Sequence, residues 1–553
     1  YLGYGGGATM KFVFCALVFM FLIGCGSTSS VTDDSGVSKD SGADSKEDTG
    51  PAAPLANIYP INPVENQQTT QVELKSLTDP DGFLTGKYAN VWNCLNKDGG
   101  DVINVVIAGM NLSGKVCKLE KVAKPGEDGT YLHIEPAAGS DPNDTFAEVM
   151  MYHHVTSVHD QFKDRLGITH MDNPMRSIVN IQAYIDLFSG WIGIENAAFV
   201  PKETGTFLKE FGVDLNKGED AIIFFQGNNV DMAYDATVIY HEYTHAVIGP
   251  ALTANAKTQY GVDPSPAALN EGLADYFAAS FLDANVIGSY GMAATGHQRD
   301  LERDFACPDH VVGETHYDGE IASGALWDLR KILTAEIADQ VIANAVLSFT
   351  QSTNFDQAAQ AILDEVRIMA PDKEAVAQAL FEERGMIGCI PLKEHTDYDN
   401  TSGSVLSPTY PSPDYLGGVF KDGVPAYLQY KVAIKPNTKE LTIEYLPIGG
   451  SDLFPGLPIP GPEANVWVAL KKGSDPITYD YATGKAVSDA LLVLKGTKIN
   501  SDHRLVLSGN CISEGDLVFQ FINKGNTEGQ ITKVKILQSE TVESGSPNFD
   551  NCD

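Results

Sequence analysis

Between residues 55 and 145, apolar residues alternate with polar ones in short runs, and Gly, Pro and Asp separate the runs. The segments 72–74 and 102–107 show this pattern. Alternation with a period of two places successive side chains on opposite faces of a strand. We therefore expect a small β-rich region over 55–145.

After residue 145 the apolar spacing becomes helical. Five residues recur every four positions over 145–166, namely Phe146, Met150, His154, Val158 and Phe162. This stripe predicts a helix whose apolar face is buried. His153 and His159 lie on the same helix, and the three histidines invite a metal-site interpretation. Because His154 belongs to the stripe, packing in the core is the favoured interpretation.

The region after residue 392 changes character again. A stretch rich in Ser, Pro, Gly and Asp at 398–422 precedes several short apolar runs separated by turn residues. The runs are 426–433, 440–446, 465–470, 503–507, 517–522 and 531–537. Short strands with turns between them predict an antiparallel β-sandwich as the C-terminal domain, 393–553. Nothing in these runs specifies a ligand.

Composition narrows the class of protein. The chain has 553 residues, of which 43% are hydrophobic, with 38 Lys and Arg against 73 Asp and Glu for a net charge of −35. So much apolar content excludes disorder throughout. The acidic balance excludes a nucleic-acid binder, because phosphate backbones are bound by clustered Lys and Arg. It also argues against attraction of the folded part to an anionic membrane.

The start of the chain has the features of an export signal. Lys11 follows the first methionine, Met10, and an apolar run over 12–23 ends in Leu-Ile-Gly-Cys at Cys25. This ending resembles the lipobox of bacterial lipoproteins. We expect residues 1–24 to be a signal peptide region, Cys25 to be lipidated, and 25–54 to be an acidic, disordered tether. The resemblance implies a lipid anchor at a bacterial cell envelope; an ordinary signal peptide with an incidental Cys is the alternative.

Six cysteines remain after Cys15 and Cys25 are set aside. Their even number and scattered positions predict disulfides, which fit an exported protein. We expect neighbours in sequence to pair: Cys94–Cys117, Cys307–Cys389 and Cys511–Cys552.

The clearest chemical signal is His-Glu-Tyr-Thr-His at 241–245, inside an apolar stretch that ends near Gly249-Pro250. Residues four apart share one face of a helix, so His241 and His245 can bind the same ion. Glu242 is one position further and can reach a water on that ion. The second helical stretch, 270–277, offers Glu271 as a third ligand, and Asp275 to hold a liganding imidazole.

Together these motifs resemble the gluzincin metallopeptidases, the thermolysin-like clan. The distance to Glu271, and the His-Tyr-Asp-Gly-Glu-Ile stretch that begins at His316, are similar to the fungalysin branch. Ala322 stands where that branch has Trp. The resemblance covers roughly residues 55–390. It implies an α+β fold with a β-rich N-terminal lobe, a helical C-terminal lobe and zinc in the cleft, with the metallopeptidase domain at 146–392.

The resemblance also implies roles for individual residues. Glu242 would act as general base and His316 would stabilise the oxyanion, with Tyr260 as a second donor. Either Asp309 or Glu314 would orient His316. Asn196 and Ala197 would belong to an edge strand that binds the extended substrate backbone. Calcium, which many thermolysin-like enzymes bind, is left open here because no EF-hand pattern is present.

The sequence therefore predicts a zinc-dependent endopeptidase acting on extracellular proteins. Two alternatives remain open. An aminopeptidase of the same clan would need a Gly-x-Met-Glu-Asn strand, which this sequence lacks. An inactive surface-binding protein would have no need for all of His241, Glu242, His245, Glu271 and Asp275.

Overall fold

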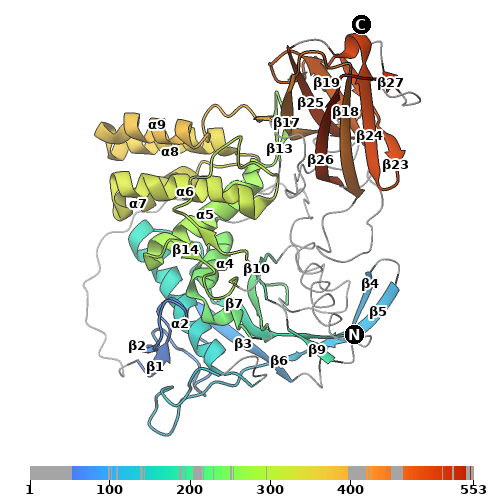
Figure 1. The fold of residues 1–553 in the computed structure, drawn as a ribbon. Coiled ribbons are helices and arrows are strands. Elements are labelled where there is room, and N and C mark those ends of the chain that lie inside the picture. Colours follow the sequence, from blue (N-terminus) through green and yellow to red (C-terminus); the bar gives the residue numbers. More distant parts are fainter. Residues whose placement is uncertain are drawn as a thin grey trace. The chain divides into compact units, whose positions relative to one another are not determined.

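The computed structural model describes most of residues 53–549 (Figure 1). The parts left out of this range are 97–99, 101, 108–109, 138–140, 142, 186–189, 194, 203–214, 216, 228, 249–251, 253–254, 294–295, 396–418, 421, 450–464, 513–514, 526–528 and 543–547. The expected signal region, the lipidated Cys25, the tether up to residue 52, and Cys552 lie outside the described residues.

The described residues mix helices and sheets, as the α+β expectation requires, with seven α-helices in the described part. They divide into two compact units. One contains residues up to Asp160 and Thr169–Ile239, and the other contains Gln161–Ile168 and residues from Tyr240 onward. Each unit is described by itself below.

The first unit is built on a five-stranded sheet in the order β10-β11-β7-β3-β6. Its strands are β3 (Ala89–Asn96), β6 (Lys118–Glu120), β7 (Met175–Ile181), β10 (Ala197–Val200) and β11 (Ala221–Phe225). All residues of β7 and β11 are buried, which explains the continuous apolar sequence of β11. β7 also buries Arg176 and Asn180, whose side chains donate hydrogen bonds to the Leu215 carbonyl and to Asn93. Among the described strands, β10 pairs only with β11, so it forms one edge of this sheet.

Two smaller sheets complete the strands of this unit. A hairpin joins β1 (Leu55–Ile58) to β2 (Thr70–Glu73). A four-stranded sheet contains β4 (Val102–Ile107), β5 (Met110–Val116), β8 (Ala183–Ile185) and β9 (Gly190–Ile192). The β-rich character expected for 55–145 is confirmed.

The helix expected over 145–166 is α2 (Phe146–Asp160), which continues as a π-helical turn, Gln161–Arg165. Asp144 caps it by accepting a hydrogen bond from the Phe146 N–H at 2.8 Å. His154 is 2% exposed and its Nε2 lies 2.9 Å from the Tyr59 carbonyl oxygen. Burial lowers the pKa of His154 to about 3. The packing interpretation of this histidine is confirmed.

The second unit begins with a helical part. Its helices are α4 (Ala236–Ile248, whose first four residues belong to the other unit), α5 (Ser265–Leu282), α6 (Thr315–Leu333), α7 (Ala335–Val346), α8 (Phe355–Met369) and α9 (Glu374–Glu383). Short pairs of strands lie between them, β12 (Ala256–Thr258) with β13 (Gly261–Asp263), and β14 (Val286–Ile287) with β15 (Arg299–Asp300).

Two glycines bring α5 and α6 into backbone contact. A Cβ on Gly272 would stand 2.7 Å from both the Ala322 Cβ and the Gly319 carbonyl oxygen. A Cβ on Gly319 would stand 3.0 Å from the Glu271 Cβ. Only glycine permits such an approach, so the crossing of α5 and α6 is fixed at the turn that carries Glu271.

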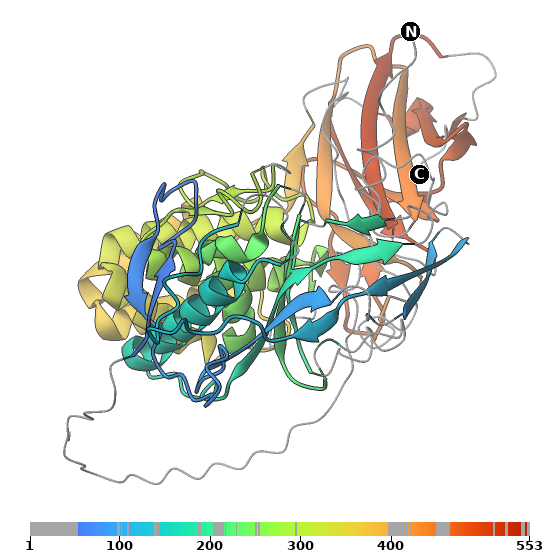
Figure 2. The ribbon, with the colours of Figure 1, turned by 90° about the horizontal axis from the view of Figure 1, so that it is seen from below.

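All six strands expected in the C-terminal region are present, as orange and red arrows in Figure 2. They are β17 (Val424–Ile434), β18 (Glu440–Gly449), β19 (Val466–Lys472), β24 (Asp502–Ser508), β25 (Gly515–Asn523) and β26 (Gly529–Ser539). β17, β25 and β19 belong to one sheet, and β24, β18 and β26 to another. Residues of both sheets, including Tyr430, Tyr445 and Phe519, share one buried core. This arrangement is a β-sandwich.

Shorter strands extend the two sheets of the sandwich, namely β16 (Leu392–Glu394), β22 (Leu492–Leu494), β23 (Thr497–Ile499) and β27 (Asn548–Phe549). β20 (Tyr479–Asp480) and β21 (Val487–Ser488) form a separate two-stranded sheet. The main pairings are antiparallel, as expected, whereas β13, β16 and β27 join in parallel.

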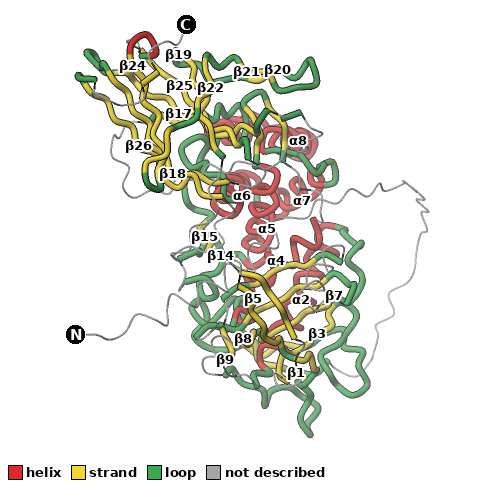
Figure 3. The backbone as a smooth tube through the Cα atoms, turned by 90° about the vertical axis from the view of Figure 1, so that its right-hand side faces the viewer, coloured by secondary structure: helices red, strands yellow, loops and turns green. Residues whose placement is uncertain are grey.

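The sandwich sheet takes in strands from outside the C-terminal region. The hairpin β12–β13, which directly precedes α5, pairs with β17 through Val262 and Ala426 and stands at the end of the sheet, where Figure 1 labels β13 beside β17. Figure 3 shows β17, β22 and β25 of this sheet in yellow. Gln520 Nε2 also donates a hydrogen bond to the Tyr260 carbonyl at 2.7 Å. The hairpin therefore links the sandwich to the helix that carries Glu271.

The structure confirms two of the expected disulfides. Cys94 pairs with Cys117 and Cys307 with Cys389, with Cα atoms 5.2 and 6.0 Å apart. Cys511 is also disulfide-bonded, and its expected partner Cys552 lies outside the described residues. No helix of the described part is both long and apolar enough to cross a membrane.

Candidate metal centre

Helix α4 presents two histidines on one face. The helix is capped by Asp235, which accepts hydrogen bonds from the Thr237 N–H at 3.1 Å and hydroxyl at 2.6 Å. His241 and His245 are one turn apart, and their Nε2 atoms are 3.0 Å from each other. Two nitrogens at this distance point their lone pairs at the same small volume.

Helix α5 brings a carboxylate to the same point. Glu271 Oε2 lies 3.2 Å from His241 Nε2 and 3.5 Å from His245 Nε2. His241, His245 and Glu271 form the one group of three potential metal ligands found among the described residues. The structure therefore assembles the ligand set that the sequence predicts. No second such group, for calcium, occurs in that part of the chain.

The spacing of these atoms fits a small tetrahedral cation. Ligands about 2.0–2.2 Å from a tetrahedral ion stand about 3.3–3.6 Å apart. The three observed separations, 3.0, 3.2 and 3.5 Å, lie close to this range. Glu271 Oε2 is buried and receives no well-directed hydrogen bond within the described part. A cation among the three atoms would satisfy it.

The outer nitrogen of each histidine is held by a separate acceptor. His241 Nδ1 donates to Asp275 Oδ1 at 2.8 Å, and His245 Nδ1 lies 3.2 Å from Asn270 Oδ1. With the proton on Nδ1, the Nε2 lone pair of each ring is left for a metal. The predicted position of Asp275 is confirmed, whereas Asn270 was not predicted to bind His245.

Arg299 is a further part of the centre that the sequence does not reveal. It is buried on β15 and donates two hydrogen bonds to Asp275, each 2.7 Å long. Burial opposes ionisation of Asp275, but Arg299 and His241 lower its pKa to about 2. Although burial also disfavours a charged His241, Asp275 raises the pKa of this imidazole to about 10. No motif contains Arg299, and only the tertiary contact identifies it.

Asp275→Asn is expected to lower zinc affinity about 10- to 100-fold, because it removes the anion that fixes the His241 tautomer. Competition with a chromogenic chelator measures this affinity. Asp283→Asn is the matched control, since Asp283 ends the same helix with an exposed side chain. Equal affinities for both variants and the wild type would contradict this role of Asp275.

His316 stands beside the ligand group. It lies in the first turn of α6, and its Nε2 is 3.5 Å from Glu271 Oε2. Its Nδ1 donates to Glu314 Oε1 at 2.7 Å, and Glu314 also caps α6 by accepting from the Tyr317 N–H. The orienting carboxylate is therefore Glu314, not Asp309. Burial lowers the pKa of His316, but Glu271 and Glu314 outweigh it and raise this pKa to about 9.

His316→Gln is expected to lower kcat about 100-fold while bound zinc stays unchanged, as for loss of one oxyanion donor. Steady-state hydrolysis of a peptide and metal analysis together measure this. His133→Gln, at an exposed histidine of the other unit, serves as the control. A loss of zinc in His316→Gln would instead make His316 part of the metal-binding set.

The remaining predicted residues are placed as follows. Glu242 follows His241 on α4, is 6% exposed and is not one of the three grouped ligands. Tyr260 lines a different cavity, and no hydrogen bond joins its hydroxyl to the ligand group among the described residues. The role of Tyr260 as a donor stays a prediction.

Asn196 and Ala197 lie in the other unit, at the start of the edge strand β10. Asn196 Oδ1 accepts a hydrogen bond from the Ala197 N–H at 2.9 Å. Its Nδ2 is buried without a hydrogen-bond partner in the described part. The predicted role of Asn196 and Ala197 in binding substrate backbone stays a prediction.

No protein-family model matches this chain, and no curated protein matches it either. The chemistry of the site therefore carries the functional conclusion.

Proposed function

We propose that this protein is a zinc-dependent endopeptidase. The observation that carries the proposal is the convergence of His241, His245 and Glu271 on one point, with Glu242 next to the first ligand on α4. Two imidazoles and a carboxylate are the donor set of a catalytic zinc site, which keeps one position open. Zinc at such a site lowers the pKa of a bound water and polarises a carbonyl group.

The protein's own groups would carry the proton transfers. Glu242 takes a proton from the attacking water and delivers it to the leaving amine. His316, held by Glu314, donates to the oxygen that becomes negative during the attack. Asp275, Asn270 and Arg299 keep the two liganding imidazoles in one tautomer and orientation.

We further propose that the fold is that of a gluzincin peptidase followed by a β-sandwich. What supports this is the order of elements: a β-rich region, then α4 with two ligands, α5 with the third, and α6 with the histidine donor. The edge strand β10, which begins directly after Asn196, would bind substrate backbone by strand addition.

We also propose that the protein works outside the cytoplasm, held by a lipid on Cys25 at a bacterial cell envelope. The disulfides of the described residues fit an oxidising compartment. The run that ends in Leu22-Ile23-Gly24-Cys25 would supply the anchor. Extracellular proteins would then be the substrates.

Paired peptide substrates test endopeptidase against aminopeptidase action. The same internally quenched peptide is offered with a free and with an acetylated N-terminus. An endopeptidase cleaves both at similar rates, because it does not bind the terminal amine. Release of only N-terminal residues from the free peptide would contradict the proposal and favour an aminopeptidase. Mass spectrometry of the products distinguishes the two.

A further inference from the structure

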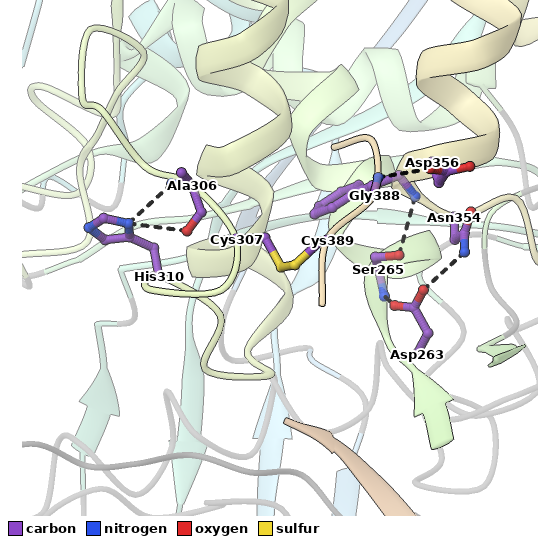
Figure 4. Close-up of a disulfide and its surroundings, with 10 residues drawn as sticks. Asp263, Ser265, Ala306, Cys307, His310, Asn354, Asp356, Gly388 and Cys389 are labelled. Carbon is purple, nitrogen blue, oxygen red and sulfur yellow. Dashed lines mark hydrogen bonds between the residues drawn. A yellow bond between two sulfur atoms is a disulfide. The ribbon is translucent and has the colours of Figure 1, made fainter. Parts of the chain in front are cut away.

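A second site lies in the unit that contains the metal centre. A cavity of about 280 Å³ is bounded by residues around the amino ends of α5 and α8, by Asp318 on α6, and by Tyr427 on β17. The Cys307–Cys389 disulfide forms part of its wall, and Figure 4 shows Asp263, Ser265 and Asn354 beside that disulfide. We refer to it as the disulfide cavity.

Three carboxylates line the disulfide cavity. Asp263 is 2% exposed and Asp318 is 3% exposed, whereas Asp356 is exposed at its rim. The Asp263 oxygens accept from the Ser265 N–H at 2.9 Å and from Asn354 Nδ2 at 3.1 Å.

The other two carboxylates are held in the same way by neutral donors. Asp318 accepts from two backbone N–H groups, of Val312 and Gly313, both at 2.8 Å. Asp356 accepts from the Gly388 N–H at 3.0 Å. These contacts fix the positions of the carboxyl groups.

No cationic side chain lies among the described residues that line the cavity: none of them is a Lys, an Arg or a His. Lys393 interacts with Asp318 at longer range, and its Nζ donates to the Asp309 carbonyl instead. Burial raises the pKa of Asp318 to about 8 and also raises that of Asp263, so the empty cavity favours the protonated form of these carboxyl groups, and a cation that enters would favour the ionised form. Buried carboxylates in this state gain from a cation that enters.

Tyr427 adds a hydroxyl from the sandwich. Its neighbours Ala426 and Leu428 belong to the sandwich core, so Tyr427 projects from the opposite face of β17. The register of β17 shifts between Pro425 and Gln429, which is where Tyr427 lies. Its side chain lines the cavity, so its hydroxyl can donate a hydrogen bond to a ligand there or accept one from it.

The arrangement favours an extended organic cation over a metal ion. The one group of three converging ligands among described residues is that of His241, so the carboxylates of the cavity do not meet at one ion. The volume is slightly below the roughly 300–1,000 Å³ of small-molecule pockets, which suits a single long side chain. The disulfide, Val311, Phe355 and Met386 offer apolar surface to the methylenes of such a chain.

We propose that the disulfide cavity binds the cationic side chain of an arginine or lysine residue in a polypeptide. The site is distinct from the metal centre. Ser265 precedes Glu271 by six residues on α5, or about 9 Å of helix. Asp318 and His316 are two residues apart on α6 and so project to different sides of it. The cavity thus serves as a docking point separate from the metal centre. Binding of a cationic side chain in it does not depend on the proposed hydrolysis.

Calorimetry on the full-length Glu242→Gln protein, with zinc bound, tests the proposal without turnover. The probes are N-acetyl-arginine amide, N-acetyl-lysine amide and N-acetyl-citrulline amide, the last being a neutral isostere of the first. At least one cationic probe is expected to bind saturably, and citrulline at least tenfold more weakly. Asp356→Asn and Tyr427→Phe are each expected to weaken binding about five- to tenfold.

Asp364→Asn is the matched control, because Asp364 is an exposed aspartate of the same helix and pairs with Arg367. Thermal unfolding verifies that each variant is folded. Absence of saturable binding by both cationic probes would overturn the proposal, as would equal binding of citrulline. Equal affinities for Asp356→Asn, Tyr427→Phe and Asp364→Asn would overturn it too. Displacement of the probe by millimolar calcium, with calcium binding lost in Asp356→Asn, would reassign the cavity to a metal.

Discussion

Replacing Glu242 by Gln is expected to lower casein hydrolysis about 10³-fold or more while zinc stays bound. A general base contributes roughly 10²–10⁴-fold, and the amide of Gln cannot accept the proton of the attacking water. The substitution preserves size at a position that is almost fully buried. Zinc is expected to be retained because Glu242 is not among the three converging ligands.

The measurement compares initial rates and metal content of wild type and variant in the same preparation. Glu383→Gln, on the exposed surface of α9, is the matched control and should keep full activity. Two results would contradict the peptidase proposal. Undiminished hydrolysis by Glu242→Gln would exclude Glu242 as the general base. Stoichiometric zinc with equally negligible activity in both proteins would favour a surface-binding role.

Replacing Glu271 by Gln is expected to weaken zinc binding more than 100-fold, beyond the effect of changing a residue that only orients a ligand. The amide is a poorer zinc ligand and no longer balances the charge of the cation. Activity should fall to background at limiting zinc. In the wild type, removal of zinc by a chelator should abolish hydrolysis, and added zinc should restore it.

Thermal and denaturant unfolding provide a second readout that does not depend on activity. A ligand that binds only the folded state stabilises it by about 2.7 kcal/mol when its free concentration is 100 times Kd. We expect zinc to raise the free energy of unfolding of the wild type and of Asp283→Asn by this amount. Glu271→Gln should show no such gain at the same zinc concentration. An equal gain in all three proteins would place the zinc elsewhere.

The hairpin β12–β13 gives the sandwich a structural relation to the metal centre. It pairs with β17 and is followed directly by α5, the helix of Glu271. Asp263, its last residue, accepts a hydrogen bond from the N–H of Ser265, the first residue of α5. The same carboxylate lines the disulfide cavity. An occupied cavity would therefore contact both the sandwich and the first turn of α5.

Local periodicity explains which features could be predicted. The pair His241 and His245 depends only on four-residue spacing in an apolar helix, and the strands of the sandwich depend only on alternation. Both kinds of element were predicted and both are present. The two described disulfides join cysteines that are neighbours in sequence, so pairing within regions was enough to predict them.

Contacts between distant segments could not be predicted in this way. Arg299 binds Asp275 across 24 residues and approaches His241 across 58, and no local period encodes either distance. The choice between Asp309 and Glu314 depended on how the chain enters α6. The pairing of the 256–263 hairpin with the sandwich crosses the domain boundary expected near residue 392.

The sequence by itself determined the candidate chemistry of this protein: two histidines and a glutamate for a metal, a neighbouring glutamate as base, and a sandwich at the C-terminal end. These follow from residue type and short-range spacing, which the geometry of a helix or strand converts directly into position. Only the tertiary structure decided which groups hold the metal-ligand side chains in place and where the acidic disulfide cavity forms. Those outcomes depend on the crossing of α5 and α6 and on the docking of β17, because packing alone brings remote side chains together.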